Sequence, residues 1–329
     1  MKGATVGETG ERELVRIIRR LFPASRREVL RGIGDDAAVV RPGRTPWILT
    51  KDLLIEDVDF RRRRHPPFLV GRKSLAVNLS DAAAMGARPA LALLGLGLPP
   101  KLELSWVREF LRGFKSQAGE YRVDLVGGDL SASREIVISV TVLAEAKKAI
   151  GRGGARPGDL ICVSGSLGDA ALGFALLEKG RGGGPAAAGP RRAFLDPTPQ
   201  VGLGLELARL GLPSAMIDIS DGLSVDLAHL CRESGAGAEI ELDRIPLSDS
   251  LTRWGRSQAL EYALNGGEDF ELLFTVHPTA RNGRLLEEIR GRHAVTPIGR
   301  ITGGRGLTAV DERGRRRRLS AAGYEHFRG

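Results

Sequence analysis

Apolar segments of this chain repeatedly end in an acidic residue that stands beside small or polar residues. Such endings are typical of buried strands and helices that are joined by tight turns. A single Asp of this kind is usually a turn former or a helix cap, but six in one chain favour a shared site. The six segments are Gly34-Asp35-Asp36, Thr50-Lys51-Asp52, Asn78-Leu79-Ser80-Asp81, Gly127-Gly128-Asp129, Asp218-Ile219-Ser220-Asp221-Gly222 and Gly266-Gly267-Glu268-Asp269.

The first half of the chain predicts strands with helices between them. Residues 47–55 and 135–146 have the β-branched composition and the alternation of strands, whereas 67–87 and 103–121 have helical patterns. Trp106, Phe110 and Phe114 recur every four residues, which predicts the buried face of a helix. With 329 residues the chain exceeds one comfortable core, and a turn at 154–159 marks a boundary near residue 150. We therefore expect two domains, 1–150 and 151–329.

The second half alternates strands and helices, which favours an α/β layer. We expect strands at 160–164, 215–219, 238–242 and 270–276, and helices at 167–179, 201–210, 223–233 and 280–290. Arg313-Gly314 between 307–310 and Leu319 predicts a closing hairpin. Residues 180–190 are rich in Gly and Ala, and we expect them to form a mobile surface loop.

Composition excludes several classes of protein. An apolar fraction of 42% with 27% charged residues is ordinary for a globular protein. Cys162 and Cys231 lack the spacing of a zinc or redox motif, so we interpret both as core thiols. Residues 1–20 carry charges throughout and contain no stretch that could serve as a signal peptide or membrane span. We expect a cytoplasmic protein with no membrane partner.

The net charge of +9 raises the possibility of a nucleic-acid-binding protein. Two arginine runs, 61–64 and 315–318, could contact phosphates, yet no helix-turn-helix, zinc finger or RNP-type pattern accompanies them. A solvated arginine-rich surface is the simpler interpretation, and we expect no nucleic-acid partner. A basic surface would also suit an enzyme whose substrates are phosphates.

Familiar nucleotide motifs are absent from the sequence. No Gly-Lys pair occurs, which excludes a P-loop, and the loose dinucleotide match at 32–37 is not followed by a helix. The acidic segments suit magnesium instead, because this hard cation takes a few carboxylate oxygens and leaves positions for phosphates. Asp218 and Asp221 follow a predicted strand, and Gly266-Gly267 permits close approach of the backbone to a ligand beside Glu268. Asp81 lies within a predicted helix, as a capping group or a metal ligand.

The ordered set of motifs resembles the thiamine-monophosphate kinase family of the aminoimidazole ribonucleotide synthetase-like (PurM-like) superfamily. The matching segments are Gly-Ile-Gly-Asp-Asp-Ala at 32–37, Ala-Val-Asn-Leu-Ser-Asp at 76–81, Gly-Gly-Asp at 127–129, Ile-Asp-Ile-Ser-Asp-Gly-Leu at 217–223, Gly-Gly-Glu-Asp-Phe-Glu-Leu at 266–272 and Gly-Tyr-Glu-His-Phe at 323–327. The resemblance covers nearly the whole chain. It implies two α/β (α+β) domains, of which the first contains a mixed sheet that forms a β-barrel across a homodimer, with ATP bound in the cleft between the domains.

The resemblance also implies the reaction and the residues that serve it. ATP and thiamine monophosphate would give ADP and thiamine diphosphate by direct in-line transfer with several magnesium ions, and Asp129, Asp218 and Asp221 would be catalytic. Magnesium ligands would be Asp35, Thr50, Asp52, Asp81, Asp129, Asp218 and Asp221. Nucleotide contacts would be Gly128, Asp129, Arg152 and Ser220, and substrate contacts would be Asp59, Glu268 and Tyr324.

Three positions depart from the family's pattern: Lys51 replaces a Thr, Asp59 replaces a His and Ala321 replaces an aromatic residue. All three belong to the substrate side of the implied site. The alternatives are a divergent PurM-like enzyme with another small anionic substrate, a nucleic-acid-binding protein that uses its arginine runs, and a non-catalytic metal-binding dimer.

Overall fold

The structure, a computed structural model, describes residues 5–9, 11–23, 27, 29–31, 39–40, 46–180 and 183–321. These residues divide into two compact units. The first contains the described residues up to Ala82 together with Ala87–Lys147. The second contains Ala83–Gly86 and the described residues from Lys148 onward.

The first unit is built on a four-stranded mixed sheet. Its strands lie in the order β3 (Trp47–Ile55), β6 (Val137–Glu145), β4 (Arg88–Leu98) and β5 (Asp124–Ala132). β6 pairs antiparallel with β3 and β4, whereas β4 and β5 are parallel because helix α4 (Leu104–Tyr121) connects them as a crossover. The described N-terminal elements are α1 (Val6–Thr9), α2 (Glu11–Leu21) and the short antiparallel pair β1 (Val29–Arg31) and β2 (Val39–Val40).

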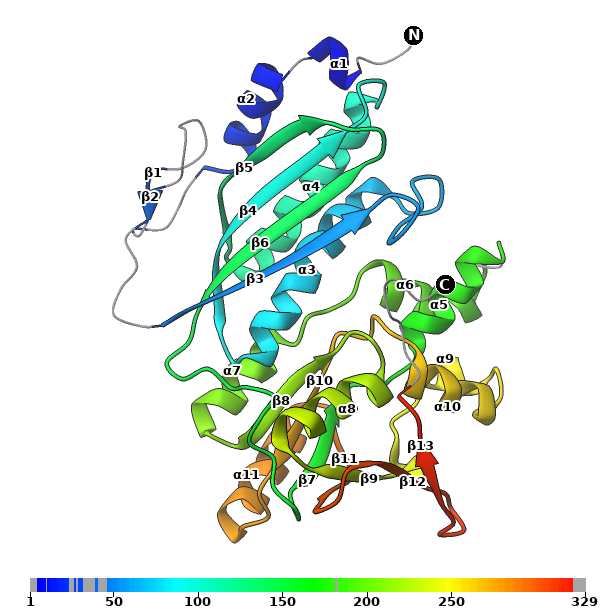
Figure 1. Ribbon diagram of the computed structural model, residues 1–329. Helices are drawn as coiled ribbons and strands as arrows, with labels where there is room; N and C mark the ends of the chain where they lie inside the picture. Colours follow the sequence, from blue (N-terminus) through cyan, green and yellow to red (C-terminus); the bar gives the residue numbers. More distant parts are fainter. Residues whose placement is uncertain are drawn as a thin grey trace. The chain divides into compact units, whose positions relative to one another are not determined.

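Helices α3 (Pro67–Ala84) and α4 cover one face of this sheet (Figure 1). Each helix has a glycine where it contacts the other helix, and neither glycine has room for a side chain. A Cβ on Gly71 would lie 2.0 Å from Phe110 O, and one on Gly113 would lie 1.8 Å from Phe68 O, so these glycines allow the close packing. Trp106 stacks on Phe110 at 5.6 Å between ring centroids, and Phe114 follows at 6.4 Å from Phe110. The predicted aromatic core face of this helix is confirmed.

The second unit contains a seven-stranded sheet in the order β13-β12-β9-β11-β7-β10-β8. Every neighbouring pair is antiparallel except β12 with β9. The strands are β7 (Leu160–Ser164), β8 (Pro213–Ile219), β9 (Gly237–Glu241), β10 (Glu271–Val276), β11 (Val295–Thr302), β12 (Gly306–Val310) and β13 (Arg316–Leu319). The sheet is therefore mixed, and the expected hairpin at Arg313-Gly314 is present between β12 and β13.

Helices complete the second unit. They are α5 (Asp169–Glu178), α6 (Pro185–Leu195), α7 (Val201–Leu210), α8 (Leu223–Ser234), the 3-10 turn η1 (Leu242–Arg244), α9 (Asp249–Thr252), α10 (Arg256–Asn265) and α11 (Ala280–Arg290). Leu223, Leu227 and Leu230 of α8 pack against Ile217 and Leu273 of the sheet to form the main core. The strand β8 and the helix α8 that follows it thus frame the loop at 218–222.

The expected loop at 180–190 is wrong over most of its length, because Pro185–Leu195 is the helix α6. Proline is tolerated in the first helical turn and alanine is the strongest helix former, so Pro185-Ala186-Ala187 starts a helix readily. Phe194 of α6 contacts Phe174 of α5 at 5.4 Å between ring centroids. A neighbouring helix supplies the apolar partner that the segment lacks by itself.

Both cysteines are buried and unpaired, as the sequence predicts for core thiols. Burial raises the pKa of the Cys162 thiol to about 12 and that of the Cys231 thiol to about 11. Among the helices in the described part of the chain, none has the length and apolar composition that crossing a membrane requires.

Candidate active site

Strand β3 and helix α3 bring three of the predicted metal ligands together in the first unit. Thr50 and Asp52 are two residues apart on β3, so their side chains lie on the same face of the strand. The Thr50 hydroxyl donates a hydrogen bond to Asp81 Oδ2, and Asp81 lies in the last turns of α3. A hydroxyl and two carboxylates thus converge from elements that are 31 residues apart in sequence.

The electrostatics of this cluster favour the binding of a cation. Burial, and then the nearby carboxylates of Asp81 and Asp59, raise the pKa of Asp52 to about 7. Asp52 Oδ2 is buried and has no hydrogen-bond partner among the described residues. These features fit a site for a hard divalent cation. The cation would offset the repulsion between the carboxylates and would give the buried Asp52 oxygen a partner.

Lys51 lies between Thr50 and Asp52 in sequence but does not share their surroundings. Side chains alternate along a strand, and the exposed Lys51 belongs to the other face of β3 with Leu49 and Leu53. Its ammonium group is therefore not placed among the carboxylates.

Asp59 has a role in the turn that follows β3. Its Oδ2 accepts a hydrogen bond from the Ile55 backbone N–H at 2.7 Å, and its carboxylate is close enough to Asp52 to affect the pKa of that residue. The carboxylate that replaces the family's His therefore holds the turn and adds negative charge beside Asp52.

Gly128 and Asp129 lie in β5. A Cβ on Gly128 would be 1.9 Å from Leu94 O of the neighbouring strand, so only glycine fits at this position. Asp129 pairs in register with Gly95 and is exposed. An exposed carboxylate next to an obligate glycine is available to a ligand, although no hydrogen bond or ion pair of the structure joins it to the Asp52 cluster within the described residues.

The second unit presents Asp218, Ser220 and Asp221 where β8 ends. The strand extends to Ile219, so Asp218 lies inside β8, opposite Leu272 of β10, and only Ser220 and Asp221 follow the strand. The Asp218 side chain is 3% exposed, whereas Ser220 and Asp221 are half-buried. β8 is an edge strand of the sheet, and its neighbour β10 is antiparallel to it.

Glu268 belongs to a second loop, 266–270, that packs against the first. The Glu268 backbone N–H donates to Ser220 O at 2.7 Å, and the Phe270 N–H donates to Ile219 O at 2.8 Å. Glu268 has a φ of 68° and Phe270 a φ of 51°, which non-glycine residues rarely adopt. Such backbone strain is common at functional sites, where the surrounding structure enforces it. The structure thus places Glu268 beside Ser220 and Asp221.

Arg152 approaches the same loop through His229 of α8. Burial, followed by the charges of Arg232 and Arg152, lowers the pKa of His229, and the charge of Asp221 raises it. Arg152 and Asp221 therefore both lie within electrostatic range of one imidazole. The exposed guanidinium of Arg152 is available to an anionic ligand.

Two predicted site residues, Asp35 and Tyr324, lie outside the described residues, as do the motifs at 32–37 and 323–327. In the parts of the chain that the structure describes, no three acidic, histidine or cysteine residues are already arranged to bind a metal ion. The candidate ligands of each unit are instead incomplete sets of hard oxygen donors.

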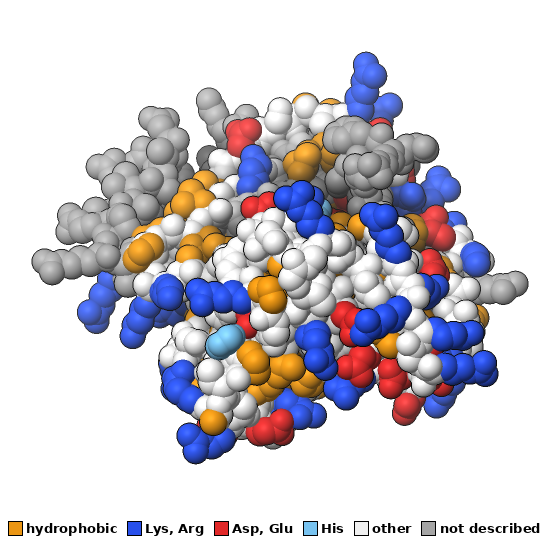
Figure 2. All heavy atoms as spheres, turned by 60° about the horizontal axis from the view of Figure 1, so that its bottom comes forward, with side chains coloured by type: hydrophobic (Ala, Val, Ile, Leu, Met, Phe, Trp, Pro, Cys, Tyr) orange, Lys and Arg blue, Asp and Glu red, His pale blue; other side chains and the backbone are white. Residues whose placement is uncertain are grey.

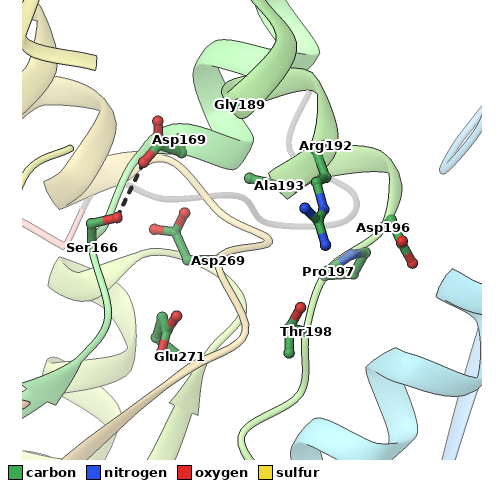
Figure 3. A pocket seen from close by; sticks show the side chains of 10 residues that line it. All are labelled: Ser166, Asp169, Gly189, Arg192, Ala193, Asp196, Pro197, Thr198, Asp269 and Glu271. Carbon is green, nitrogen blue, oxygen red and sulfur yellow. Dashed lines mark hydrogen bonds between the residues drawn. The ribbon is translucent and has the colours of Figure 1, made fainter. Parts of the chain in front are cut away.

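A pocket in the second unit shows that acidic residues here can also be structural. Asp169, Asp269 and Glu271 lie on one side of it and Arg192 on the other (Figure 3). Asp269 accepts the Gly168 N–H at 2.8 Å, Asp169 accepts the Ser248 hydroxyl at 2.8 Å, and Glu271 accepts from Ser164 and Gln200. These carboxylates have protein donors already, so they anchor the start of α5 and the start of β10. Asp269, in the last of the six acidic segments, is therefore a structural residue.

The arginine runs are partly neutralised by neighbouring acids. Arg62 pairs with Glu56 at 2.9 Å, Arg315 with Asp311 at 2.7 Å and Arg316 with Glu239 at 3.1 Å. On the face shown in Figure 2, lysine and arginine side chains are scattered, with acidic side chains between many of them. This distribution favours a solvated surface over a nucleic-acid site.

Comparisons with known proteins agree with the motifs. A family model described as AIR synthase related protein, N-terminal domain, matches residues 34–146, and the corresponding C-terminal domain model matches 156–312. The thiamine-monophosphate kinase of Aquifex aeolicus (strain VF5) is 37% identical over 326 residues, which cover 97% of this chain and 99% of the relative. The chain belongs to the thiamine-monophosphate kinase family.

Solved structures of the thiamine-monophosphate kinase family share the fold. The enzyme of Stenotrophomonas maltophilia K279a superposes with a TM-score of 0.81 at 36% identity, over 94% of this chain and 97% of that one. AaThiL complexed with AMPPCP and TMP superposes with a TM-score of 0.78 at 35% identity, over 98% and 99%. The predicted family and the two-domain PurM-like fold with a mixed sheet are therefore confirmed. The homodimer and the roles of single residues stay predictions.

One residue of the site that the sequence analysis missed is Asp226, in the first turn of α8. Its Oδ2 accepts the backbone N–H groups of Ser220, Asp221 and Gly222, each at 3.1 Å. The sequence contains a signal for this role: α8 begins directly after Gly222, and an acidic residue in the first turn of a helix can accept backbone N–H groups from the segment that precedes it.

Proposed function

We propose that the chain is a kinase that transfers the γ-phosphoryl group of ATP to thiamine monophosphate, giving ADP and thiamine diphosphate. The observation that carries this proposal is the full-length similarity to AaThiL, whose solved structure holds AMPPCP, an analogue of ATP, and TMP. The acidic residues of both units have the chemistry that two phosphate substrates require.

Magnesium ions would be bound by Thr50, Asp52, Asp81 and Asp129 of the first unit and by Asp218 and Asp221 of the second, with Asp35 as a further ligand. Bound magnesium neutralises the phosphate charges so that two anions can approach each other. The domain at 1–150 would carry most magnesium and nucleotide contacts and the dimer contact. The domain at 151–329 would supply the remaining active-site residues.

The chain's own groups would position the substrates. Gly128 permits close approach of the β5 backbone to the nucleotide, the Ser220 hydroxyl and the Arg152 guanidinium would contact ATP phosphates, and Glu268 would contact the thiamine moiety. The second ionisation of a phosphate monoester has a pKa near 6, so the attacking oxygen of thiamine monophosphate is ionised at neutral pH. No general base or covalent intermediate is needed, and every carboxylate can serve as a ligand in a direct in-line transfer.

The outer face of the four-stranded sheet supports a homodimer. Leu49, Leu53 and Leu93 are 67%, 50% and 36% exposed, although they stand in the middle of regular strands. The register Lys51–Thr141–Leu93 puts them on the face that α3 and α4 do not cover. Large apolar side chains exposed on one face of a sheet are typical of an interface, and a second copy of this face is the proposed partner. The two unpaired thiols fit the reducing cytoplasm, where we place the enzyme.

The experiment is to incubate the purified chain with magnesium and ATP, with and without thiamine monophosphate, and to follow thiamine diphosphate by chromatography. We expect thiamine diphosphate only when both substrates and magnesium are present. Asp218→Asn should lower kcat/KM at least about 100-fold, because it removes charge where two anions meet. Asp243→Asn, at an exposed position of η1, is the matched control and should keep wild-type activity.

Two outcomes would contradict the proposal. ATP binding without any thiamine diphosphate would indicate a divergent enzyme with another small anionic substrate. Absence of both ATP binding and turnover would indicate a non-catalytic dimer.

A further inference from the structure

Asp226 is a buried carboxylate of the second unit that is bonded entirely to backbone amides. It is 1% exposed in the first turn of α8, and one oxygen, Oδ2, accepts three consecutive backbone N–H groups at 3.1 Å from Ser220, Asp221 and Gly222. Three amides that converge on one oxygen form the kind of concave nest that usually receives a phosphate or another anion. In this protein the anion is a side chain of the same chain.

The carbonyl side of the loop is also occupied. Ile219 O accepts the Phe270 N–H, and Ser220 O accepts the Glu268 N–H. A Cβ on Gly267 would lie 2.5 Å from Ser220 O, so the second loop is pressed against the first. The backbone of residues 219–222 is thus bonded on both sides within the protein.

This arrangement limits how the loop can meet a nucleotide. Its amides are already bonded to Asp226, so they do not form a phosphate cradle in the way a P-loop does. A nucleotide would instead meet the side chains of this loop, and the directions of the Ser220 and Asp221 side chains depend on the backbone that Asp226 holds.

We infer that Asp226 is a positioning residue of the phosphoryl-transfer site: it occupies the amide nest at 220–222 and thereby orients the Ser220 and Asp221 side chains that would serve magnesium and ATP. This inference rests on the proposed function for the identity of the ligand but not for the identity of the acceptor. Removal of a residue that hydrogen-bonds to the metal-binding residues, without itself binding the metal, typically lowers metal affinity or activity about 10–100-fold.

The test compares Asp226→Ala with Asp226→Asn. The alanine variant removes the acceptor, whereas the asparagine variant keeps an oxygen at the same place and loses the charge. We expect Asp226→Ala to weaken binding of magnesium-AMPPCP by about 10–100-fold in calorimetry and to raise the magnesium concentration needed for half-maximal binding. Asp226→Asn should recover most of that affinity. Hydrogen exchange at the Ser220–Gly222 amides should accelerate in the alanine variant and much less in the asparagine variant.

The matched control is Thr279→Ala. Thr279 caps α11 through its hydroxyl, which accepts the Asn282 N–H at 3.1 Å, so its loss removes a helix cap away from the acidic loop. We expect Thr279→Ala to lower the melting temperature without changing affinity for magnesium-AMPPCP. If Asp226→Ala behaves in the same way, lowering stability alone, Asp226 is only a helix cap and the inference is overturned.

The outcome separates this inference from the proposed function. If the wild type makes no thiamine diphosphate but binds magnesium-AMPPCP, and Asp226→Ala loses that binding, the acceptor is wrong and the positioning role stands. If the wild type does not bind magnesium-AMPPCP, there is no nucleotide site for Asp226 to position, and the inference is overturned.

Discussion

At the scale of single residues, burial and local donors decide what each carboxylate of this chain can do. Asp129 is exposed beside an obligate glycine and is available to a ligand. Asp226 and Glu271 are acidic like Asp129, but their oxygens are bonded to backbone or side-chain donors. The same residue type therefore serves as a candidate ligand at one position and as a structural anchor at another.

Glu271 gives a prediction about pH. Burial raises the pKa of Glu271 to about 7, while hydrogen bonds from Ser164 and Gln200 oppose that rise. The folded state binds this proton more tightly than the unfolded state, so the stabilisation is complete below about pH 4.5 and is lost as the pH rises through 7. Glu271→Gln cannot ionise, and we expect it to be more stable than the wild type at pH 8 by at most about 3 kcal/mol.

The measurement is thermal unfolding of both proteins at pH 5 and pH 8. The stability advantage of Glu271→Gln should be larger at pH 8 than at pH 5. Glu288→Gln, at an exposed position of α11, should show no such difference. An equal loss of stability for Glu271→Gln at pH 5 and at pH 8 would contradict a raised pKa of Glu271 in the folded protein.

At the scale of elements, close helix contacts explain why a segment without large apolar groups folds as α6. Gly173 of α5 faces the middle of α6, where a Cβ would lie 2.1 Å from Pro190 O and 3.0 Å from Phe194 Cβ. The contact therefore depends on the absence of a side chain in α5.

Replacement of two helical glycines by alanine should have opposite effects on the stability of the second unit. We expect Gly173→Ala to destabilise the second unit by about 1–3 kcal/mol, because the added methyl group must push α6 away from α5. Gly202→Ala in α7 meets no atom within 4 Å at an exposed position, so it should stabilise by about 0.5–1 kcal/mol through helix propensity. Urea unfolding of the two variants measures both changes in stability. An equal change in the unfolding midpoint for both variants would contradict the close contact between Gly173 and α6.

At the scale of the whole molecule, the proposed homodimer gives a prediction about the face of the four-stranded sheet that α3 and α4 do not cover. We expect the wild type to have about twice the chain mass of 35.3 kDa in light scattering. Leu53→Glu should give a monomer, because it replaces an apolar contact of the proposed interface with a carboxylate that loses its water on association. Val58→Glu, at a turn residue that is also 50% exposed, is the control and should stay dimeric. A monomeric wild type would refute the homodimer.

Local patterns predicted much of the fold because they depend on neighbouring residues. The strands at 47–55 and 160–164 and the helices at 201–210 and 280–290 match the structure residue for residue. The long strand β4 was missed, since a continuous apolar run such as Leu91–Leu98 has no alternation to identify it. The loop predicted at 180–190 failed for a different reason, because α6 gains its apolar contacts from α5.

The sequence by itself determined the family, the acidic motifs and the residue types that phosphate substrates require, since these depend only on the identity and order of residues along the chain. Only the tertiary structure decided which of these acids lie near one another. The Thr50–Asp81 hydrogen bond, the repulsion around Asp52 and the contact of the 218–222 loop with Glu268 each join segments that are distant in sequence. Burial and hydrogen-bond partners are properties of the folded chain, and they separate the ligand candidates from Asp226, Asp269 and Glu271.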